Sequence, residues 1–234
     1  MEKHITTVMT RYKGKVDTYD VCNEIMEDNG QLRNSYWLKR VGDFDGDGDE
    51  YDYIEQAFII AHKADPDARL IINDYNLEWS ESKTRGYYNL IKSMLEDGIQ
   101  VDGIGFQCHI GVDTDINQFR RNMQILEGLR KYNPDFKFEI TELDMSVYQW
   151  NDNKEVPYTT QLSDKQTRKY RQLFDLLIDY AEKDILDTVV FWGLSDNNSW
   201  LNKANQKNYP MLFDRSYKMK DCFWEVIELA EERK

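Results

Sequence analysis

Cysteine and histidine are scarce in this 234-residue chain, with three residues of each. An odd, sparse set of cysteines does not form a disulfide framework, and no Cys-x-x-Cys pair is present to hold a structural zinc ion. No His-x-His or His-Glu-x-x-His spacing occurs either, so the sequence predicts no metal site and no cofactor. We expect the three cysteines to be small buried apolar side chains: Cys22, Cys108 and Cys222.

Long apolar runs and positive net charge are also lacking. No run approaches the ~20 residues of a membrane span, and the first residues hold no apolar stretch like that of a signal peptide. The formal net charge of −13 repels both nucleic-acid phosphates and anionic membrane surfaces. We therefore expect no nucleic-acid partner and no membrane insertion, and a neutral ligand suits this charge better.

Apolar and aromatic residues, by contrast, are plentiful. Hydrophobic residues make up 41% of the chain and aromatic residues 13%, which is ample for a buried core and argues against disorder. The fifteen tyrosines and six tryptophans have two interpretations. They fill the core, or some of them stack on the apolar faces of sugar rings.

Short apolar runs alternate with longer amphipathic segments along the chain. The predicted strands are 16–21, 69–72, 101–106, 136–140 and 188–192, and the predicted helices are 53–63, 80–97, 116–132, 163–183 and 222–232. This alternation predicts an α/β fold with a parallel sheet, either doubly wound or closed into a barrel. No repeat or linker interrupts the pattern, so we expect one domain over residues 1–234.

Each predicted strand runs into polar and aromatic residues at its carboxyl end. These clusters begin at Asn23, Asn73, Gln107, Glu142 and Trp192. Barrel enzymes collect their active sites from many strand ends, whereas a doubly wound sheet uses one switch point and usually a glycine-rich turn. Because no such turn is present, the sequence favours the (β/α)8 TIM barrel.

Pairs of polar residues two positions apart should share one face of a strand. Glu142 and Asp144 form one such pair, and Gln107 and His109 form another. Asn23 and Glu24 are adjacent, and both cannot point inward from a regular strand. We therefore expect a bulge or the strand end at that point.

Glu24 and Glu142 end different predicted strands, which is what glycoside hydrolysis requires of its two carboxyl groups. One group must stay protonated to serve the leaving oxygen, and the other must be ionised to attack the sugar or activate water. The chain contains 43 acidic residues, so spacing alone does not single out this pair.

Five segments carry a resemblance to a known family, and they occur in the family's order. They are DVCNE, IINDYN, DGIGFQCH, ITELD and VVFWGLSDNNSW, and PMLFD follows them near the end. Together they resemble glycoside hydrolase family 10, the endo-β-1,4-xylanases, over essentially the whole chain. The resemblance implies a retaining endo-xylanase that acts on xylan or xylo-oligosaccharides, secreted or held in the periplasm or at the cell surface.

The resemblance also implies roles for individual residues. Glu24 would be the general acid/base and Glu142 the nucleophile, with their carboxyl groups about 5–5.5 Å apart. His109 would contact Glu142 and keep it oriented and ionised, and Asp144 would orient His109.

Further positions match residues that bind substrate in the family. Asn23 would bond the sugar 2-hydroxyl, and Gln107 would lie beside the reacting sugar. An ordinary core role remains the alternative for His109 and for Trp192. The other implied positions are Trp192 and Trp200, as apolar walls that stack on sugar, and Tyr75 and Asn76 on the aglycone side.

Two departures from the family leave alternatives open. The resemblance implies that the chain holds the last five βα units of the barrel, without the three N-terminal units. We expect an N-terminal segment in cis or in trans, or self-association, to complete it. Otherwise the chain is an incomplete barrel that only binds sugar. A hydrolase of related β-1,4-glucans is a third reading, because residues that choose between xylose and glucose would lie largely outside these units.

The segment Asp43–Asp49 has carboxylates at alternate positions and Gly48 at the sixth, like the start of a calcium-binding loop. Such a loop requires a glutamate at its twelfth position, where this chain has Ile54. A solvated acidic loop is therefore the better interpretation.

Overall fold

The computed structural model describes all residues except 44–45, 47–49, 150–151 and 153. The chain divides into two compact units, Met1–Phe106 with Arg121–Glu139, and Gln107–Arg120 with Ile140–Lys234. Strands and helices alternate along it, and the strand pairs with a defined register are parallel. The predicted α/β fold is therefore confirmed.

The sheet of the first unit has β1 (Thr18–Asn23), β2 (Arg69–Asp74) and β3 (Gly103–Phe106) in that order. The register of β1 against β2 shifts between Asp20 and Cys22, so β1 contains a bulge just before its end. Five of the six residues of β2 are buried, because this strand lies between two others and is covered on both faces.

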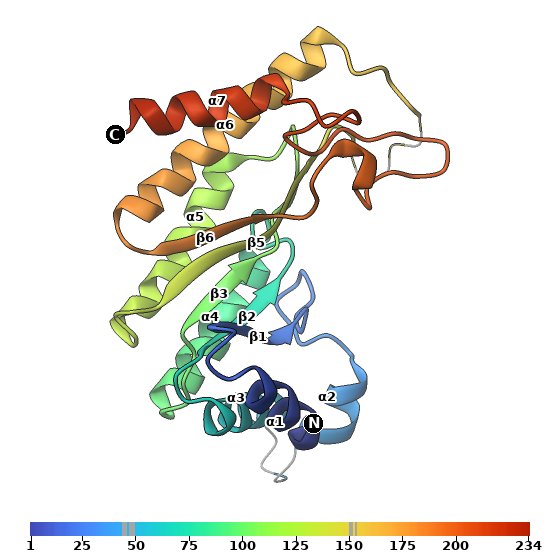
Figure 1. Cartoon of the computed structure of the whole chain (residues 1–234). Helices are drawn as coiled ribbons and strands as arrows, with labels where there is room; N and C mark the ends of the chain where they lie inside the picture. Colours follow the sequence, from blue (N-terminus) through green and yellow to red (C-terminus); the bar gives the residue numbers. More distant parts are fainter. Residues whose placement is uncertain (44–45, 47–49, 150–151, 153) are drawn as a thin grey trace. The chain divides into compact units, whose positions relative to one another are not determined.

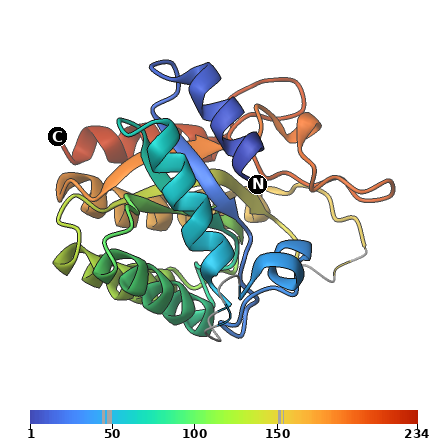
Figure 2. The same ribbon diagram turned by 90° about the horizontal axis from the view of Figure 1, so that it is seen from below.

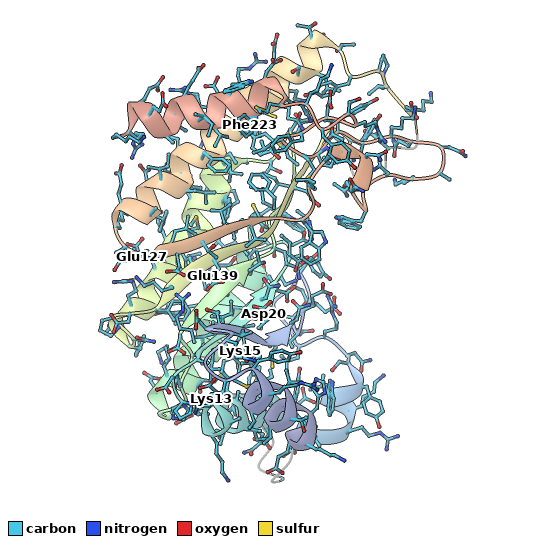
Figure 3. All side chains as sticks on the ribbon, viewed as in Figure 1. Lys13, Lys15, Asp20, Glu127, Glu139 and Phe223 are labelled. Carbon is cyan, nitrogen blue, oxygen red and sulfur yellow. The ribbon has the colours of Figure 1, made fainter. Side chains whose placement is uncertain are left out.

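Four helices belong entirely to the first unit: α1 (Glu2–Tyr12), α2 (Tyr36–Val41), α3 (Asp52–Ala64) and α4 (Glu81–Glu96). Helix α1 packs beside α3 (Figure 2), and Lys13 at its end, labelled in Figure 3, lies 3.5 Å from a carboxylate oxygen of Asp65. The hydroxyl of Ser80 caps α4 by accepting the Lys83 N–H. Gly98 has φ +77° and follows the end of α4, as the sequence predicts.

The second unit holds the remaining strands and the C-terminal helices. Its strands are β4 (His109–Gly111), β5 (Lys137–Ser146, which begins within the first unit) and β6 (Leu186–Phe191). Helices α6 (Thr160–Glu182) and α7 (Asp221–Glu232) and the 3-10 turn η2 (Asp196–Asn198) also belong to the second unit. Helix α5 (Ile116–Glu127) begins in the second unit and ends in the first, which also holds the 3-10 turn η1 (Gly128–Lys131). Strand β5 pairs with β4 and with β6, and α7 lies along α6 (Figure 1).

Several predicted boundaries are wrong by a few residues. The helix predicted from residue 163 begins at Thr160, because the hydroxyl of Thr159 accepts the Leu162 N–H at 3.3 Å. The Ser163 hydroxyl instead donates to Asp221. The strand predicted to end at residue 140 continues to Ser146, and the helix predicted to reach residue 132 ends at Glu127 in a 3-10 turn.

Each unit has its own aromatic packing. In the first, the rings of Phe106 and Phe138 pack edge to face, with centroids 5.4 Å apart. In the second, Phe223 on α7, labelled in Figure 3, packs against Phe213 at 5.3 Å. The three cysteines are buried and free, as predicted, and burial raises the pKa of the Cys22 thiol to about 12. Among the residues that the structure describes, no helix is both long and apolar enough to cross a membrane.

Candidate active site

Glu24 sits at the point where β1 ends. The strand ends at Asn23, and Glu24 has φ +56°, a left-handed backbone conformation that residues other than glycine seldom adopt. Its N–H donates to the carbonyl oxygen of Asn73 at 2.9 Å, and the Asn73 amide donates to the Asn23 side chain at 3.0 Å. Of the two predicted alternatives at Asn23 and Glu24, the strand end is the one observed, since the register shift of β1 lies earlier, between Asp20 and Cys22. A strained residue at a strand end is typical of functional sites.

Arg33 is the cation beside Glu24. A guanidinium nitrogen of Arg33 lies 3.0 Å from the Glu24 carboxylate. The Arg33 backbone N–H is fixed by the Ile25 carbonyl at 2.8 Å, and a second guanidinium nitrogen donates to the Tyr75 hydroxyl. The loop after β1 thus folds back on itself and places a positive charge against the glutamate.

Beneath Tyr75 lies a buried ion pair that belongs to β2 and α4. Lys83 Nζ is 2.8 Å from Asp74 Oδ1, and both side chains are fully buried. Lys83 Nζ also lies 3.8 Å from the centroid of the Tyr75 ring, within cation–π range. The Tyr87 hydroxyl donates to Asp74 as well. Burial raises the pKa of Asp74, and the adjacent Lys83 charge and these hydrogen bonds oppose that rise.

Asn76 follows in the same turn, with φ +64°. Its side-chain amide lies 3.1 and 3.2 Å from the two carboxylate oxygens of Asp28, and the carbonyl of Asp28 accepts the Ser80 hydroxyl. The ends of β1 and β2 therefore bring together Asn23, Glu24, Tyr75 and Asn76 within the first unit.

In the second unit, one imidazole links two carboxylates of β5. His109 Nε2 lies 3.3 Å from Glu142 Oε2, and His109 Nδ1 lies 3.0 Å from Asp144 Oδ1. Asp144 is fully buried, while the His109 and Glu142 side chains retain 18% and 15% of their exposure. The predicted common face of Glu142 and Asp144 is confirmed, as are both contacts of His109. The imidazole is thus held between the two carboxylates, one at each ring nitrogen.

The face predicted for Gln107 and His109 assumes a regular strand, and that assumption is wrong. Cys108 has φ +62°, so β3 ends at Phe106 and β4 begins at His109. The carbonyl of Gln107 accepts the Glu142 N–H at 3.1 Å, and the Gln107 side chain is buried. This irregular link fixes Gln107 and His109 beside β5 through backbone hydrogen bonds.

Trp192 and Trp200 are about half exposed, at 48% and 49%. The Trp192 N–H donates to the carbonyl of Leu143, which ties the residue after β6 to β5. Trp200 makes a contact that the sequence does not predict, because its indole N–H donates to Asp144 Oδ2 at 2.7 Å. Its ring also meets His109 edge to face, with centroids 5.1 Å apart.

Residues 1–229 match the model of glycosyl hydrolase family 10. The chain belongs to this family. It is 42% identical over 236 residues to "Endo-1,4-beta-xylanase C" of Paenibacillus barcinonensis, a match that covers 97% of this chain and 21% of that protein. It is 36% identical over 237 residues to "Endo-1,4-beta-xylanase" of Geobacillus stearothermophilus, covering 98% of this chain and 67% of that protein.

A solved family 10 structure from Paenibacillus barcinonensis has the same fold. The TM-score is 0.92 and the identity 41%, over 98% of this chain and 66% of that chain. The predicted barrel class is therefore confirmed. The chain spans about a fifth of the length of the first relative and about two thirds of the solved one.

Two side chains that contact the candidate site residues or their neighbours are not predicted from the sequence. Arg33 lies nine residues beyond Glu24 in an irregular loop. Lys83 lies within the helix predicted at 80–97, and nothing in its spacing indicates a buried ion pair. The acidic segment 43–49 lies mostly outside the described residues. Among the described residues, no three or more His, Cys, Asp or Glu side chains are grouped to hold a metal ion.

Proposed function

We propose that this family 10 chain carries the catalytic carboxylates of a retaining endo-1,4-β-xylanase, which hydrolyses internal β-1,4 bonds of xylan. The observation that carries the proposal is the array of Glu142, His109 and Asp144. A mostly buried carboxylate oriented by a neighbouring imidazole is suited to nucleophilic attack. The two curated relatives described above are both named endo-1,4-beta-xylanases, which supports xylan as the substrate.

In the proposed mechanism, a carboxylate oxygen of Glu142 attacks the anomeric carbon, and the bond between that carbon and the leaving oxygen breaks. Glu24 gives its proton to that oxygen, leaving a sugar esterified to Glu142. Glu24, now ionised, takes a proton from water, whose oxygen attacks the same carbon and releases Glu142. Two inversions at the same carbon give net retention of the anomeric configuration.

The remaining polar and aromatic side chains are proposed to bind the sugar. Asn23 is proposed to bond the 2-hydroxyl, where hydrogen bonds strengthen in the transition state. Gln107 is proposed to lie beside the reacting sugar. The other proposed contacts are Trp192 and Trp200 as walls, and Tyr75 and Asn76 toward the aglycone.

The test is release of reducing sugar from xylan, joined to covalent trapping. A 2-deoxy-2-fluoro xylobioside with a good leaving group should add one sugar mass to Glu142, located by peptide mass spectrometry. Glu142→Gln should abolish both turnover and labelling. The matched control is Glu139→Gln, which removes another carboxylate from β5 and should keep both. Labelling that persists in Glu142→Gln would exclude Glu142 as the nucleophile.

A second candidate is a sugar-binding form that turns over only when a further segment is supplied. The chain spans 66% of the solved relative's chain, so both situations can be assayed directly. Turnover is measured with the 234-residue chain alone and after adding the part of that relative which this chain does not cover. Activity in the second assay only, with xylo-oligosaccharide binding in both, would favour this candidate.

We also propose that residues 1–234 form part of one catalytic domain, which acts on polymer outside the cytoplasm, either secreted or in the periplasm or at the cell surface. A polymeric substrate supports this location, since xylan does not enter cells. Immunodetection in fractionated cells of the source organism tests it, and antigen confined to the cytoplasm would refute it. The same activity assays should include cellulose and mixed-linkage β-glucan, because comparable rates there would indicate a broader β-1,4-glycanase.

A further inference from the structure

A buried ion pair lies in the irregular segment that follows β6, outside the residues assigned to chemistry. Asp196 and Lys220 are 24 residues apart, and Lys220 Nζ lies 3.2 and 3.4 Å from the two Asp196 carboxylate oxygens. Their side chains are 1% and 5% exposed. Both belong to the second unit, as do their described hydrogen-bond partners.

Lys220 contacts residues that precede it in the sequence. Its ammonium donates to the carbonyls of Tyr209 and Met211, both at 2.8 Å, and lies 4.8 Å from the Tyr158 ring centroid. Two backbone carbonyl oxygens and the Asp196 carboxylate thus surround the buried Lys220 ammonium. The Lys220 ammonium therefore holds Asp196 close to the backbone of Tyr209 and Met211.

Asp196 binds the same segments from the other side. Its Oδ1 accepts the Met211 N–H at 2.8 Å, and its own N–H donates to the Phe213 carbonyl at 2.9 Å. The pair therefore fixes both the start of η2 and the return of the chain at residues 209–213. Burial raises the pKa of Asp196 and lowers that of Lys220, so each charge is costly without the other.

Asp196 lies four residues before Trp200 in the sequence. The Asn202 amide donates to the carbonyls of Asp196 at 2.8 Å and Ser199 at 2.9 Å, which closes the turn around Trp200. The Trp200 indole then reaches Asp144 at 2.7 Å. A continuous set of contacts runs from the ion pair to the partner of His109.

We propose that Asp196 and Lys220 are positioning residues that place Trp200 so that its indole N–H holds Asp144, which in turn orients His109 against Glu142. A buried ion pair adds little net stability compared with apolar side chains of the same size, whereas it specifies one arrangement of the chain. The effect on catalysis rests on the proposed function, whereas the placement of Trp200 is independent of it.

The test measures placement and catalysis separately. The variants are Lys220→Met, Asp196→Asn and the double variant Asp196→Leu/Lys220→Met. The double variant removes both charges together, and so should stay folded if a single change does not. The control is Lys165→Met, which removes an exposed ion pair of the same unit, with Lys165 Nζ 2.6 Å from Asp113. Folding of each variant is checked by circular dichroism.

The first readout is the indole N–H resonance of Trp200 in ¹⁵N-labelled protein, assigned by its loss in Trp200→Phe. It should move toward the position of a water-exposed indole, with faster solvent exchange, in the double variant and in each single variant that folds. Lys165→Met should leave it unchanged. An unmoved resonance in the folded double variant overturns the proposal, whether or not the protein hydrolyses xylan.

The second readout is kinetics on xylo-oligosaccharides, per folded molecule. Displacing a catalytic group by about 1 Å costs on the order of 10²-fold, so kcat should fall about 10- to 100-fold. A purely structural pair would lower the midpoint of thermal unfolding and leave kcat unchanged, which would overturn the catalytic part. If the unsubstituted chain is inactive, the proposed function fails, and the indole readout still decides the placement.

Discussion

Lys83→Met is the substitution whose effect the structure defines best. Methionine has nearly the volume of lysine, so the change removes a charge and leaves almost no cavity. Asp74 would lose the ammonium 2.8 Å from its carboxylate and remain fully buried. The Tyr75 ring would lose the cation 3.8 Å from its centroid.

The expected loss follows from these contacts. Removing one partner of a buried ion pair typically costs about 3–5 kcal/mol, because the other charge stays buried without compensation. Losing the cation–π contact adds about 1 kcal/mol, while hydrogen bonds to Asp74 from Tyr87 and from the Met26 and Tyr75 N–H groups remain. Because these remaining hydrogen bonds offset part of the loss, we expect the unfolding free energy to fall by about 3–5 kcal/mol at pH 7.

The pH dependence gives the prediction a sign. Burial already raises the pKa of Asp74, and removing the Lys83 charge takes away the main effect that opposes the rise. A carboxyl whose folded pKa is above its unfolded value loses stability as pH rises through the folded pKa. The deficit of Lys83→Met relative to the unsubstituted protein should therefore be largest at neutral pH and shrink as the pH is lowered.

The assay is urea unfolding, with hydrogen exchange of peptides from 69–96 to locate the loss in β2 and α4. Lys92→Met, which breaks the exposed pair with Glu96 on α4, is the matched control and should have no measurable effect. Lys83→Met/Asp74→Asn should be more stable than Lys83→Met alone, since no charge remains buried. A loss below about 1 kcal/mol for Lys83→Met would refute the reasoning, because it falls outside the range for a broken buried pair.

Two further predictions concern other parts of the chain. Hydrogen bonds from Arg233 and Arg120 lower the pKa of Asp179 below its ordinary 3.8. Asp179→Asn should therefore destabilise by about 1 kcal/mol near pH 6, with the difference vanishing as pH falls through the folded pKa, measured by thermal unfolding. Iodoacetamide at pH 8 should leave Cys22 unlabelled in native protein and label it in urea, because burial raises its pKa to about 12; native labelling would contradict its burial.

The sequence predicts elements well where local signals agree. The helix predicted at 80–97 has a capping Ser80 and a terminal Gly98, and the structure places α4 at Glu81–Glu96. Strand ends are less well predicted. The strand predicted at 136–140 reaches Ser146, because β5 continues past the two consecutive polar residues Thr141 and Glu142.

Features set by irregular backbone or distant side chains lie outside such patterns. Nothing in the order of residues predicts φ +62° at Cys108, which invalidates the strand periodicity used for Gln107 and His109. The contact of Arg33 with Glu24 depends on a loop that returns to Ile25. The family motif identifies both glutamates and the contact of His109 with Glu142, whereas the contact of Arg33 with Glu24 follows only from the three-dimensional structure.

Trp200 shows how a correct position can carry an incomplete interpretation. The motif marks it as a wall that stacks on sugar, and its half-exposed ring is compatible with that role. Its indole N–H is nevertheless committed to Asp144. A phenylalanine at this position would keep an apolar wall and lose the hydrogen bond, so the two roles are separable by substitution.

The two proposed catalytic glutamates have similar support, each from within its own unit. Behind Glu24, Arg33 contacts Tyr75, and the Tyr75 ring lies over Lys83, which pairs with the fully buried Asp74. Behind Glu142, His109 contacts the fully buried Asp144, which Trp200 also holds. In both cases a buried aspartate at a strand end anchors aromatic or cationic side chains that reach a less buried carboxylate. Each of the contacts described here lies within one unit.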